Sequence, residues 1–320
     1  MRPRPPLVIV LFLLVGCAHT ERVHPAQLNE TAPAEFEPCV VEGSPGYRVS
    51  LPHYVIYSTI ADHQTLVQIG QLMEGALIAY RNLGPGVPPT DRPMESFVFQ
   101  TRTQWAAYTR AHTGDDAAIY LRVNRGGYTV GDRFVAYWIG DIGTFSVAAH
   151  EGWHQYVARH LKGRLPPFLE EGLACLFEQV EWVDGLPRFD VTRNRPRLLS
   201  LRAAVDSGDM YPLGKLVQMH AGQVVGQRNS RIEAFYAESW AFARFLNEAD
   251  GGKYQPALRQ MLFDAARGQL YADNTIEDAT GPLWDPSSAR PMLKHYLGMD
   301  LEQIEIAFAR YVHHLVDDLE

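Results

Sequence analysis

Residues 145 to 161 read FSVAAHEGWHQYVARHL, and this stretch decides both the fold and the candidate site. On an α-helix, His150 and His154 lie about 40° apart in azimuth and about 6 Å apart along the axis. Both imidazoles can therefore reach one ion from a single face. Glu151 is turned by about 100° from His150, which suits a base acting on a metal-bound water better than a ligand. The spacing is the HExxH arrangement, in which two histidines bind zinc.

A catalytic zinc takes three protein ligands, so one more must come from elsewhere in the chain. Residues 166 to 174 read PPFLEEGLA, and the proline pair can start a helix. Glu171, one turn into this helix, would complete a set of two imidazoles and one carboxylate. Glu170 is the alternative ligand, but it is turned about 100° away and is expected to be solvated.

A competing set of ligands consists of His150, His154 and His160, which have the spacing HExxHxxGxxH. In that motif the glycine bends the chain back at the end of the helix. Here the position is occupied by Val157, a β-branched residue that adopts positive φ poorly. If the helix continues, His160 lies about 240° from His154 and faces elsewhere. We therefore favour the glutamate.

The segment HEGWH followed by PPFLEEGLACLFE resembles the gluzincin zinc peptidases, in particular the bacterial peptidase MA-like lipoproteins. Their pattern is HExxH, then Pro-aromatic-Leu-x-Glu-Gly-x-Ala and an aromatic-Glu pair. In that family the glutamate before the glycine binds zinc, which here implies Glu171. Phe168 stands where the family usually has tryptophan. The likeness covers most of the chain from about residue 50, but only the two zinc segments are specific.

The resemblance implies a zinc metallopeptidase in which Glu151 takes a proton from the metal-bound water and the nucleophile attacks a peptide carbonyl. Tyr236, in the segment FYAESW, is by resemblance a donor to the developing oxyanion. A core tyrosine on an amphipathic helix is an equally good interpretation. His220 is a weaker candidate. Glu178 either orients a zinc histidine or is a solvated helix residue.

The periodicity of the rest predicts an α+β fold: a small mixed sheet with helices, the zinc helix pair, and a mainly helical C-terminal part. Strands are expected at 53–60, 96–100, 118–123 and 133–139, with a turn at 126–128. Helices are expected at 64–83, 103–112, 196–205, 232–247 and 301–315, with loops at 182–195 and 281–290. Gluzincins resemble one another in binding the substrate backbone on an edge strand, and by position 133–139 is the candidate. An ordinary sheet strand is the alternative.

The first residues resemble a bacterial lipoprotein signal, because two arginines precede a short apolar run that ends in Val15-Gly16-Cys17. We expect a signal at 1–16, lipidation of Cys17 and a tether at 17–44 that is rich in proline and polar residues. A zinc-binding domain is expected at 45–200, and a helical part at 201–320 that completes the site. In a host with two membranes, Ala18 after the cysteine resembles a signal for sorting to the outer membrane, with the protein on the periplasmic side of the bacterial cell envelope.

The formal net charge of −8 argues against nucleic-acid binding. Expected partners are a peptide or protein substrate and the membrane, through the lipid anchor. Cys39 and Cys175 could pair in an oxidising compartment, although Cys175 beside the metal site could equally be a small buried residue. The rival function is a catalytically inactive gluzincin fold that serves as a binding or scaffold module of the envelope.

Overall fold

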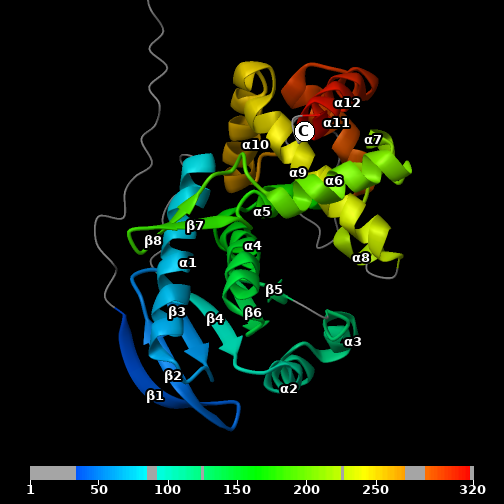
Figure 1. Ribbon diagram of the computed structural model, residues 1–320. Coiled ribbons are helices and arrows are strands. Elements are labelled where there is room, and N and C mark those ends of the chain that lie inside the picture. The colour runs from blue at the N-terminus through cyan, green and yellow to red at the C-terminus, as the bar shows by residue number, and fades with distance from the viewer. Residues whose placement is uncertain (1–33, 85–91, 124–125, 225–226, 271–284, 318–320) are drawn as a thin grey trace, which may run out of the picture.

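The structure is a computed structural model that describes residues 34–84, 92–123, 126–224, 227–270 and 285–317 (Figure 1). The predicted signal at 1–16, the expected lipidation at Cys17, Ala18 and residues 281–284 of a predicted loop lie outside the described residues. The described chain has one six-stranded mixed sheet, one small hairpin and a helical C-terminal part. The predicted α+β fold class is confirmed.

The large sheet is built from both parallel and antiparallel strands. In spatial order these are β1 (Glu35–Val41), β2 (Ser44–Ser50), β3 (Tyr54–Ser58), β4 (Met94–Phe99), β6 (Arg133–Tyr137) and β5 (Gly127–Val130). Strands β3, β4 and β6 run parallel to one another, and the remaining pairings are antiparallel. Because β5 lies outside β6, β5 is the edge strand on this side of the sheet, and β1 is the edge strand on the other side. The strand predicted at 133–139 is β6, which lies inside the sheet. It is therefore an ordinary sheet strand, which was the alternative to an edge strand that binds substrate.

Alternate residues of the strands face two different cores, as expected for a period of two. In β6, Phe134 and Ala136 join the main core, whereas Val135 and Tyr137 join a smaller one. Helices α1 (His63–Leu83) and α4 (Asp141–His160) pack together on the main-core side. Helix α2 (Arg102–His112), followed by a short 3-10 turn (Gly114–Asp116) and α3 (Ala117–Tyr120), packs on the other side.

Helices dominate the chain after α4. They are α5 (Pro167–Cys175), α6 (Arg195–Ser207), α7 (Leu213–Leu216), α8 (Ala221–Val224), α9 (Asn229–Gly252), α10 (Gln255–Arg267), α11 (Ala289–Leu297) and α12 (Leu301–Asp317), with a 3-10 turn (Pro286–Ser288) before α11. The helices predicted at 196–205, 232–247 and 301–315 are confirmed. Within the described ranges, no helix has the length and apolar character needed to cross a membrane.

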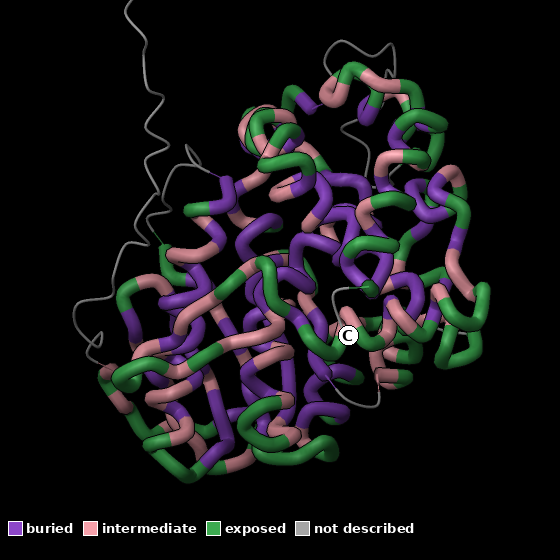
Figure 2. Tube along the Cα trace, turned by 45° about the horizontal axis from the view of Figure 1, so that its top comes forward, coloured by how far each residue is buried: buried purple, intermediate pink, exposed green. Residues whose placement is uncertain are grey.

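The main core continues from the sheet into the last helix (Figure 2). It contains Val49 of β2, Phe168 of α5 and Phe308 of α12. Helices α5 and α9 are in especially close contact, because a Cβ atom added to Gly172 would lie 2.1 Å from the backbone oxygen of Ser239. The ranges 45–200 and 201–320 therefore share one core.

Four predictions about the chain are wrong. Residues 35–41, expected in a tether, form β1 and pair with β2, so folded structure starts before residue 45. Residues 118–123, expected as a strand, form most of α3 and a turn, and β5 begins inside the predicted 126–128 turn. Residues 182–195, expected as a loop, hold most of the hairpin formed by β7 (Val180–Val183) and β8 (Leu186–Phe189).

Candidate metal centre

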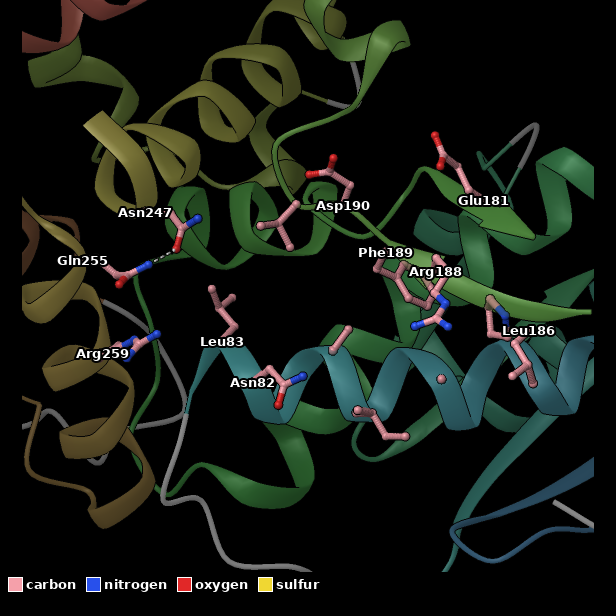
Figure 3. A pocket seen from close by; sticks show the side chains of 15 residues that line it. Asn82, Leu83, Glu181, Leu186, Arg188, Phe189, Asp190, Asn247, Gln255 and Arg259 are labelled. Carbon is pink, nitrogen blue, oxygen red and sulfur yellow. Dashed lines mark hydrogen bonds between the residues drawn. The ribbon is translucent and has the colours of Figure 1, made fainter. Parts of the chain in front are cut away.

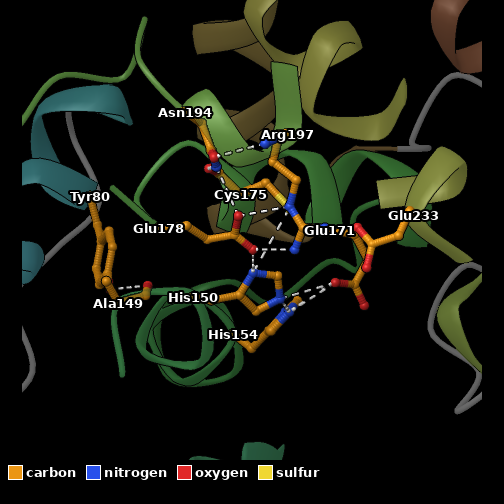
Figure 4. Close-up of polar contacts among 10 residues, drawn as sticks. All are labelled: Tyr80, Ala149, His150, His154, Glu171, Cys175, Glu178, Asn194, Arg197 and Glu233. Carbon is orange, nitrogen blue, oxygen red and sulfur yellow. Dashed lines mark hydrogen bonds and ion pairs between the residues drawn. The ribbon is translucent and has the colours of Figure 1, made fainter. Parts of the chain in front are cut away.

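Helix α4 carries both histidines of the HExxH segment on one face. It runs for 20 residues without interruption and ends at His160. The hydroxyl of Tyr80 on α1 donates a hydrogen bond of 2.6 Å to the carbonyl oxygen of Ala149, which ties the turn before His150 to the core. The ring centroids of His150 and His154 lie 5.1 Å apart, and Figure 4 shows both rings on the same side of the helix.

Glu171 reaches the two rings from α5. Pro166 is the N-cap of this helix and Pro167 its first residue, which suits proline because the missing N–H has no helical partner there. Oε2 of Glu171 lies 3.2 Å from Nε2 of His150 and 3.4 Å from Nε2 of His154. The two Nε2 atoms are 3.3 Å apart. The three residues selected from the sequence are thus brought together.

The triangle formed by these three atoms has the size of a zinc coordination shell. With metal–ligand distances of about 2.0–2.1 Å and tetrahedral angles, donor atoms lie about 3.3 Å from one another. All three side chains are partly buried, and two imidazoles with one carboxylate are a donor set that catalytic zinc sites use. His150, His154 and Glu171 could therefore hold a metal ion.

Each imidazole is also held from behind by a second carboxylate. Nδ1 of His150 lies 3.0 Å from Oε1 of Glu178, and Nδ1 of His154 lies 2.9 Å from Oε1 of Glu170. Such partners fix the ring orientation and leave Nε2 for the metal. The expectation that Glu170 is solvated is therefore wrong, and for Glu178 the structure supports the orienting role.

Glu178 is itself held by residues of the segment that starts α6. Nη2 and Nε of Arg197 donate to its two carboxylate oxygens at 2.7 and 2.8 Å, and the side-chain amide of Asn194 donates at 2.8 Å. Burial alone would raise the pKa of Glu178, but Arg197 lowers it well below the usual range. The carboxylate facing His150 therefore stays ionised.

A second group of possible ligand atoms consists of His150, Cys175 and Glu178. Sγ of Cys175 lies 3.9 Å from Nδ1 of His150, and burial raises the pKa of the thiol to about 11. This group would have to bind a cation where Arg197 already neutralises Glu178. The triangle on the Nε2 side is the better candidate.

The charge balance around the triangle favours a cation. Burial lowers the pKa of His154, but the neighbouring Glu171 and Glu170 outweigh burial and raise it to about 10. Burial likewise raises the pKa of Glu171, but the two histidines lower it well below its ordinary value. Without a metal, protons on the imidazoles balance the carboxylates. A metal ion binding to Nε2 would displace such protons.

Glu151 lies beside the triangle and is not part of it. Its carboxylate oxygen Oε2 accepts a hydrogen bond of 3.1 Å from the hydroxyl of Thr129, a residue of the edge strand β5. The same hydroxyl lies 3.0 Å from the backbone oxygen of Glu151. The carboxylate is thereby directed toward β5.

Tyr236 reaches the site from α9. Its ring centroid lies 6.3 Å from that of His150, and the guanidinium of Arg197 lies 5.0 Å from the tyrosine ring. Burial raises the pKa of Tyr236, with a further contribution from the negative charge of Glu171. The hydroxyl therefore stays protonated and able to donate. The residue is near the metal residues, yet it also packs against the core.

The remaining candidates lie apart from the triangle. His160 is buried, and its Nδ1 lies 2.9 Å from the carbonyl oxygen of Tyr156 on the same helix, so it is not placed as a ligand. His220 is exposed at the start of α8. Cys39 on β1 and Cys175 are both free, and the considered disulfide is not formed.

The sequence did not indicate three residues that shape the site. Thr129 was missed because no strand was predicted between the turn at 126–128 and the strand at 133–139. The sequence predicted only that Asn194 lies near the end of a loop and that Arg197 lies in a helix. In the structure, Asn194 caps α6 by accepting a hydrogen bond from the N–H of Arg197. A cap signal marks the helix start but carries no information about the distant Glu178.

No family model, curated protein or solved structure matches this chain. The fold and the site define an α+β protein with a possible metal site of two histidines and one glutamate between α4 and α5.

Proposed function

We propose that this protein is a gluzincin-type zinc metallopeptidase of the bacterial peptidase MA-like lipoprotein family, anchored to the cell envelope through Cys17. The observation that carries the proposal is the triangle of His150, His154 and Glu171, with atom separations of 3.2 to 3.4 Å. Zinc is favoured because imidazoles suit it and because the triangle fits its bond lengths. Peptide hydrolysis is favoured because Glu151 stands beside the triangle on the same helix.

Each residue of the site has its own role in the proposed hydrolysis. Zinc bound to the triangle would lower the pKa of a water molecule and polarise the substrate carbonyl. Glu151 accepts the proton of that water, with its carboxylate held by Thr129. Tyr236, kept protonated by burial, donates to the oxygen that becomes negative. Glu170 and Glu178 keep the two imidazoles in place during turnover.

We propose that the substrate backbone binds along strand β5, and not along residues 133–139. It has β6 on one side and, within the described ranges, no strand on the other. Its unpaired backbone groups can add an extended peptide to the sheet. Thr129 on this strand contacts Glu151, so a peptide lying along β5 passes next to the base.

The decisive experiment measures zinc content and cleavage of a mixed peptide library by the wild type and Glu151→Gln. We expect about one zinc per chain in both proteins, with cleavage only by the wild type. Glu35→Gln on β1 is the matched control and should cleave normally. Equal cleavage by Glu151→Gln would remove its role as base. Zinc binding without any cleavage by the wild type would favour the inactive binding or scaffold module.

The role of Tyr236 is tested with Tyr236→Phe. Loss of one donor to an oxyanion lowers kcat by about 10²- to 10³-fold, whereas zinc content should stay the same. An unchanged kcat would leave Tyr236 as a core residue.

The anchor is tested in cells with Cys17→Ser. The wild type should incorporate labelled fatty acid and fractionate with the outer membrane, and the variant should do neither. Labelling of the variant would contradict lipidation at Cys17.

A further inference from the structure

The edge strand β5 has an apolar face opposite to the one that meets α4. Thr129 points to the α4 face, where it contacts Glu151. Because side chains alternate along a strand, Tyr128 and Val130 point to the other face. Tyr128 is buried in the smaller core on that face, whereas Val130 is 37% exposed. Val130 is thus an apolar side chain that an edge strand leaves partly uncovered.

A row of aromatic rings continues this face beyond the edge of the sheet. Trp105 of α2 contacts Tyr137 of β6 and Tyr128 of β5, with ring centroids 5.3 and 5.9 Å apart. Tyr120 of α3 stacks on Tyr128, with centroids 4.3 Å apart. Figure 1 shows α3 on the side of β5 that faces away from β4. Tyr120 therefore extends the row past the free edge of β5.

Tyr120 also lies close enough to the proposed base to respond to its charge. Burial raises the pKa of Tyr120, and the negative charges of Asp116 and Glu151 raise it further. The tyrosine is only partly buried, and the preceding residue, Ile119, is 51% exposed. Helix α3 therefore places uncovered apolar surface near the part of β5 where hydrolysis is proposed.

A hollow elsewhere in the molecule is not placed to bind this part of a substrate. It has about 420 Å³ of space between α1, the β7–β8 hairpin, α9 and α10 (Figure 3). Neither the metal-site residues nor any residue of β5 lines it. Next to β5, the side chains of a bound peptide therefore meet the surface of β5 and α3.

The geometry points to a subsite for an apolar side chain of the substrate, formed by Ile119, Tyr120 and Val130. This inference rests on the proposed function, in which the substrate backbone pairs with β5. Residues directly opposite each other in neighbouring strands point to the same face. The substrate residue opposite Thr129 therefore faces α4, and its two neighbours in sequence face α3. The subsite selects an aliphatic or aromatic residue at one or both of these neighbouring positions.

Cleavage of short blocked alanine peptides by the zinc-loaded full chain tests the subsite, with leucine, serine or lysine placed at one position at a time. At a position that faces α3, kcat/KM should be about tenfold higher for leucine than for serine, at the lower end of what apolar pockets achieve. Val130→Ser should remove most of this preference. Val40→Ser is the matched control, because Val40 is also exposed and lies on β1, the other edge strand.

Two further variants keep the test valid if Val130→Ser folds poorly. Val130→Asp should make lysine the preferred residue at the same position, and a damaged protein would not gain a new preference. Ile119→Ser should lower the preference for leucine, whereas Ile306→Ser, at an exposed isoleucine of α12, should leave it unchanged. A leucine preference that survives in both Val130 variants overturns the subsite.

Binding of the same peptides, carrying a fluorescent label, to the zinc-loaded Glu151→Gln variant separates the subsite from the chemistry. Fluorescence anisotropy should show tighter binding of the leucine peptides, and Val130→Ser in this background should abolish the difference. Cleavage without any preference for leucine overturns the subsite and leaves the proposed function standing. A preference in binding without cleavage by the wild type supports the subsite and contradicts the peptidase. If no peptide is bound or cleaved, the subsite is overturned as well.

Discussion

Nη2 of Arg197 lies 2.7 Å from Oε1 of Glu178, and that oxygen also lies 3.0 Å from Nδ1 of His150. The same arginine faces the ring of Tyr236. One partly buried cation therefore contacts both the carboxylate that orients His150 and the ring of Tyr236. The candidate metal centre therefore has contacts with α6 and α9 as well as residues on α4 and α5.

Replacing Glu178 by glutamine should lower zinc affinity by about 10- to 100-fold, because the charged partner of His150 is lost. Competition with a chromogenic chelator measures the effect. Glu233→Gln is the control, since this more exposed carboxylate also contacts Arg197 but no histidine. Equal zinc affinity in the Glu178 variant and the control would contradict the orienting role.

Glu171→Gln should abolish stoichiometric zinc binding, whereas Glu170→Gln should weaken it by about 10- to 100-fold. The difference follows from geometry, because Glu171 faces Nε2 of both histidines and Glu170 faces only Nδ1 of His154. Metal content after dialysis is the measurement. If Glu170→Gln lost the metal and Glu171→Gln kept it, Glu170 would be the ligand.

Gly172→Ala should destabilise the protein by about 3 kcal/mol or more, because the added methyl group would meet the backbone oxygen of Ser239 at 2.1 Å. Backbone cannot move aside as a flexible side chain does. Gly214→Ala is the control, since its new Cβ would have one neighbour at 3.8 Å. Urea unfolding compares the two, and equal stability would disprove the close contact.

Glu238 on α9 should make stability depend on pH. Burial raises its pKa from 4.5 to about 8, although it accepts hydrogen bonds from the N–H of Tyr211. Below about pH 4.5 both states hold the proton, so Glu238 has no effect. Between about pH 4.5 and 8 the unfolded chain loses the proton first, so stability falls as pH rises. The full loss, reached above about pH 8, is on the order of 5 kcal/mol.

Glu238→Gln removes this titration while keeping an oxygen acceptor for Tyr211. Urea unfolding at pH 5 and pH 8 should show a smaller difference for the variant than for the wild type. Other groups titrate equally in both proteins, so the comparison isolates Glu238. Identical differences would show that the carboxyl group is not held in its neutral form.

The zinc helices could be predicted because their signals are local. The spacing of His150 and His154 fixes a common helix face, and Pro167 marks where α5 begins. The orientation of Glu171 toward the rings also agrees with the resemblance. The contacts of Glu178 with Arg197 could not be predicted, because they join segments whose relative placement depends on packing.

There are also physical reasons why β1 and the β7–β8 hairpin were not predicted from the sequence. Strand β1 lies at a sheet edge and most of its side chains are at least partly exposed, so its sequence lacks hydrophobic alternation. Pro38 is tolerated there because edge strands have unpaired positions. The hairpin could have been found, since Asp184-Gly185 between apolar residues is typical of a tight turn. Both residues adopt positive φ, at 52° and 76°.

The absence of a side chain at Gly172 leaves two helical backbones almost touching, at Ser239 of α9. The helix that bears Glu171 cannot slide along or roll over the one that bears Tyr236 without a backbone collision. Any change in the spacing of the candidate metal residues therefore cannot come from the α5–α9 contact. One glycine thus fixes the distance between the helix that carries a candidate metal ligand and the helix that carries Tyr236.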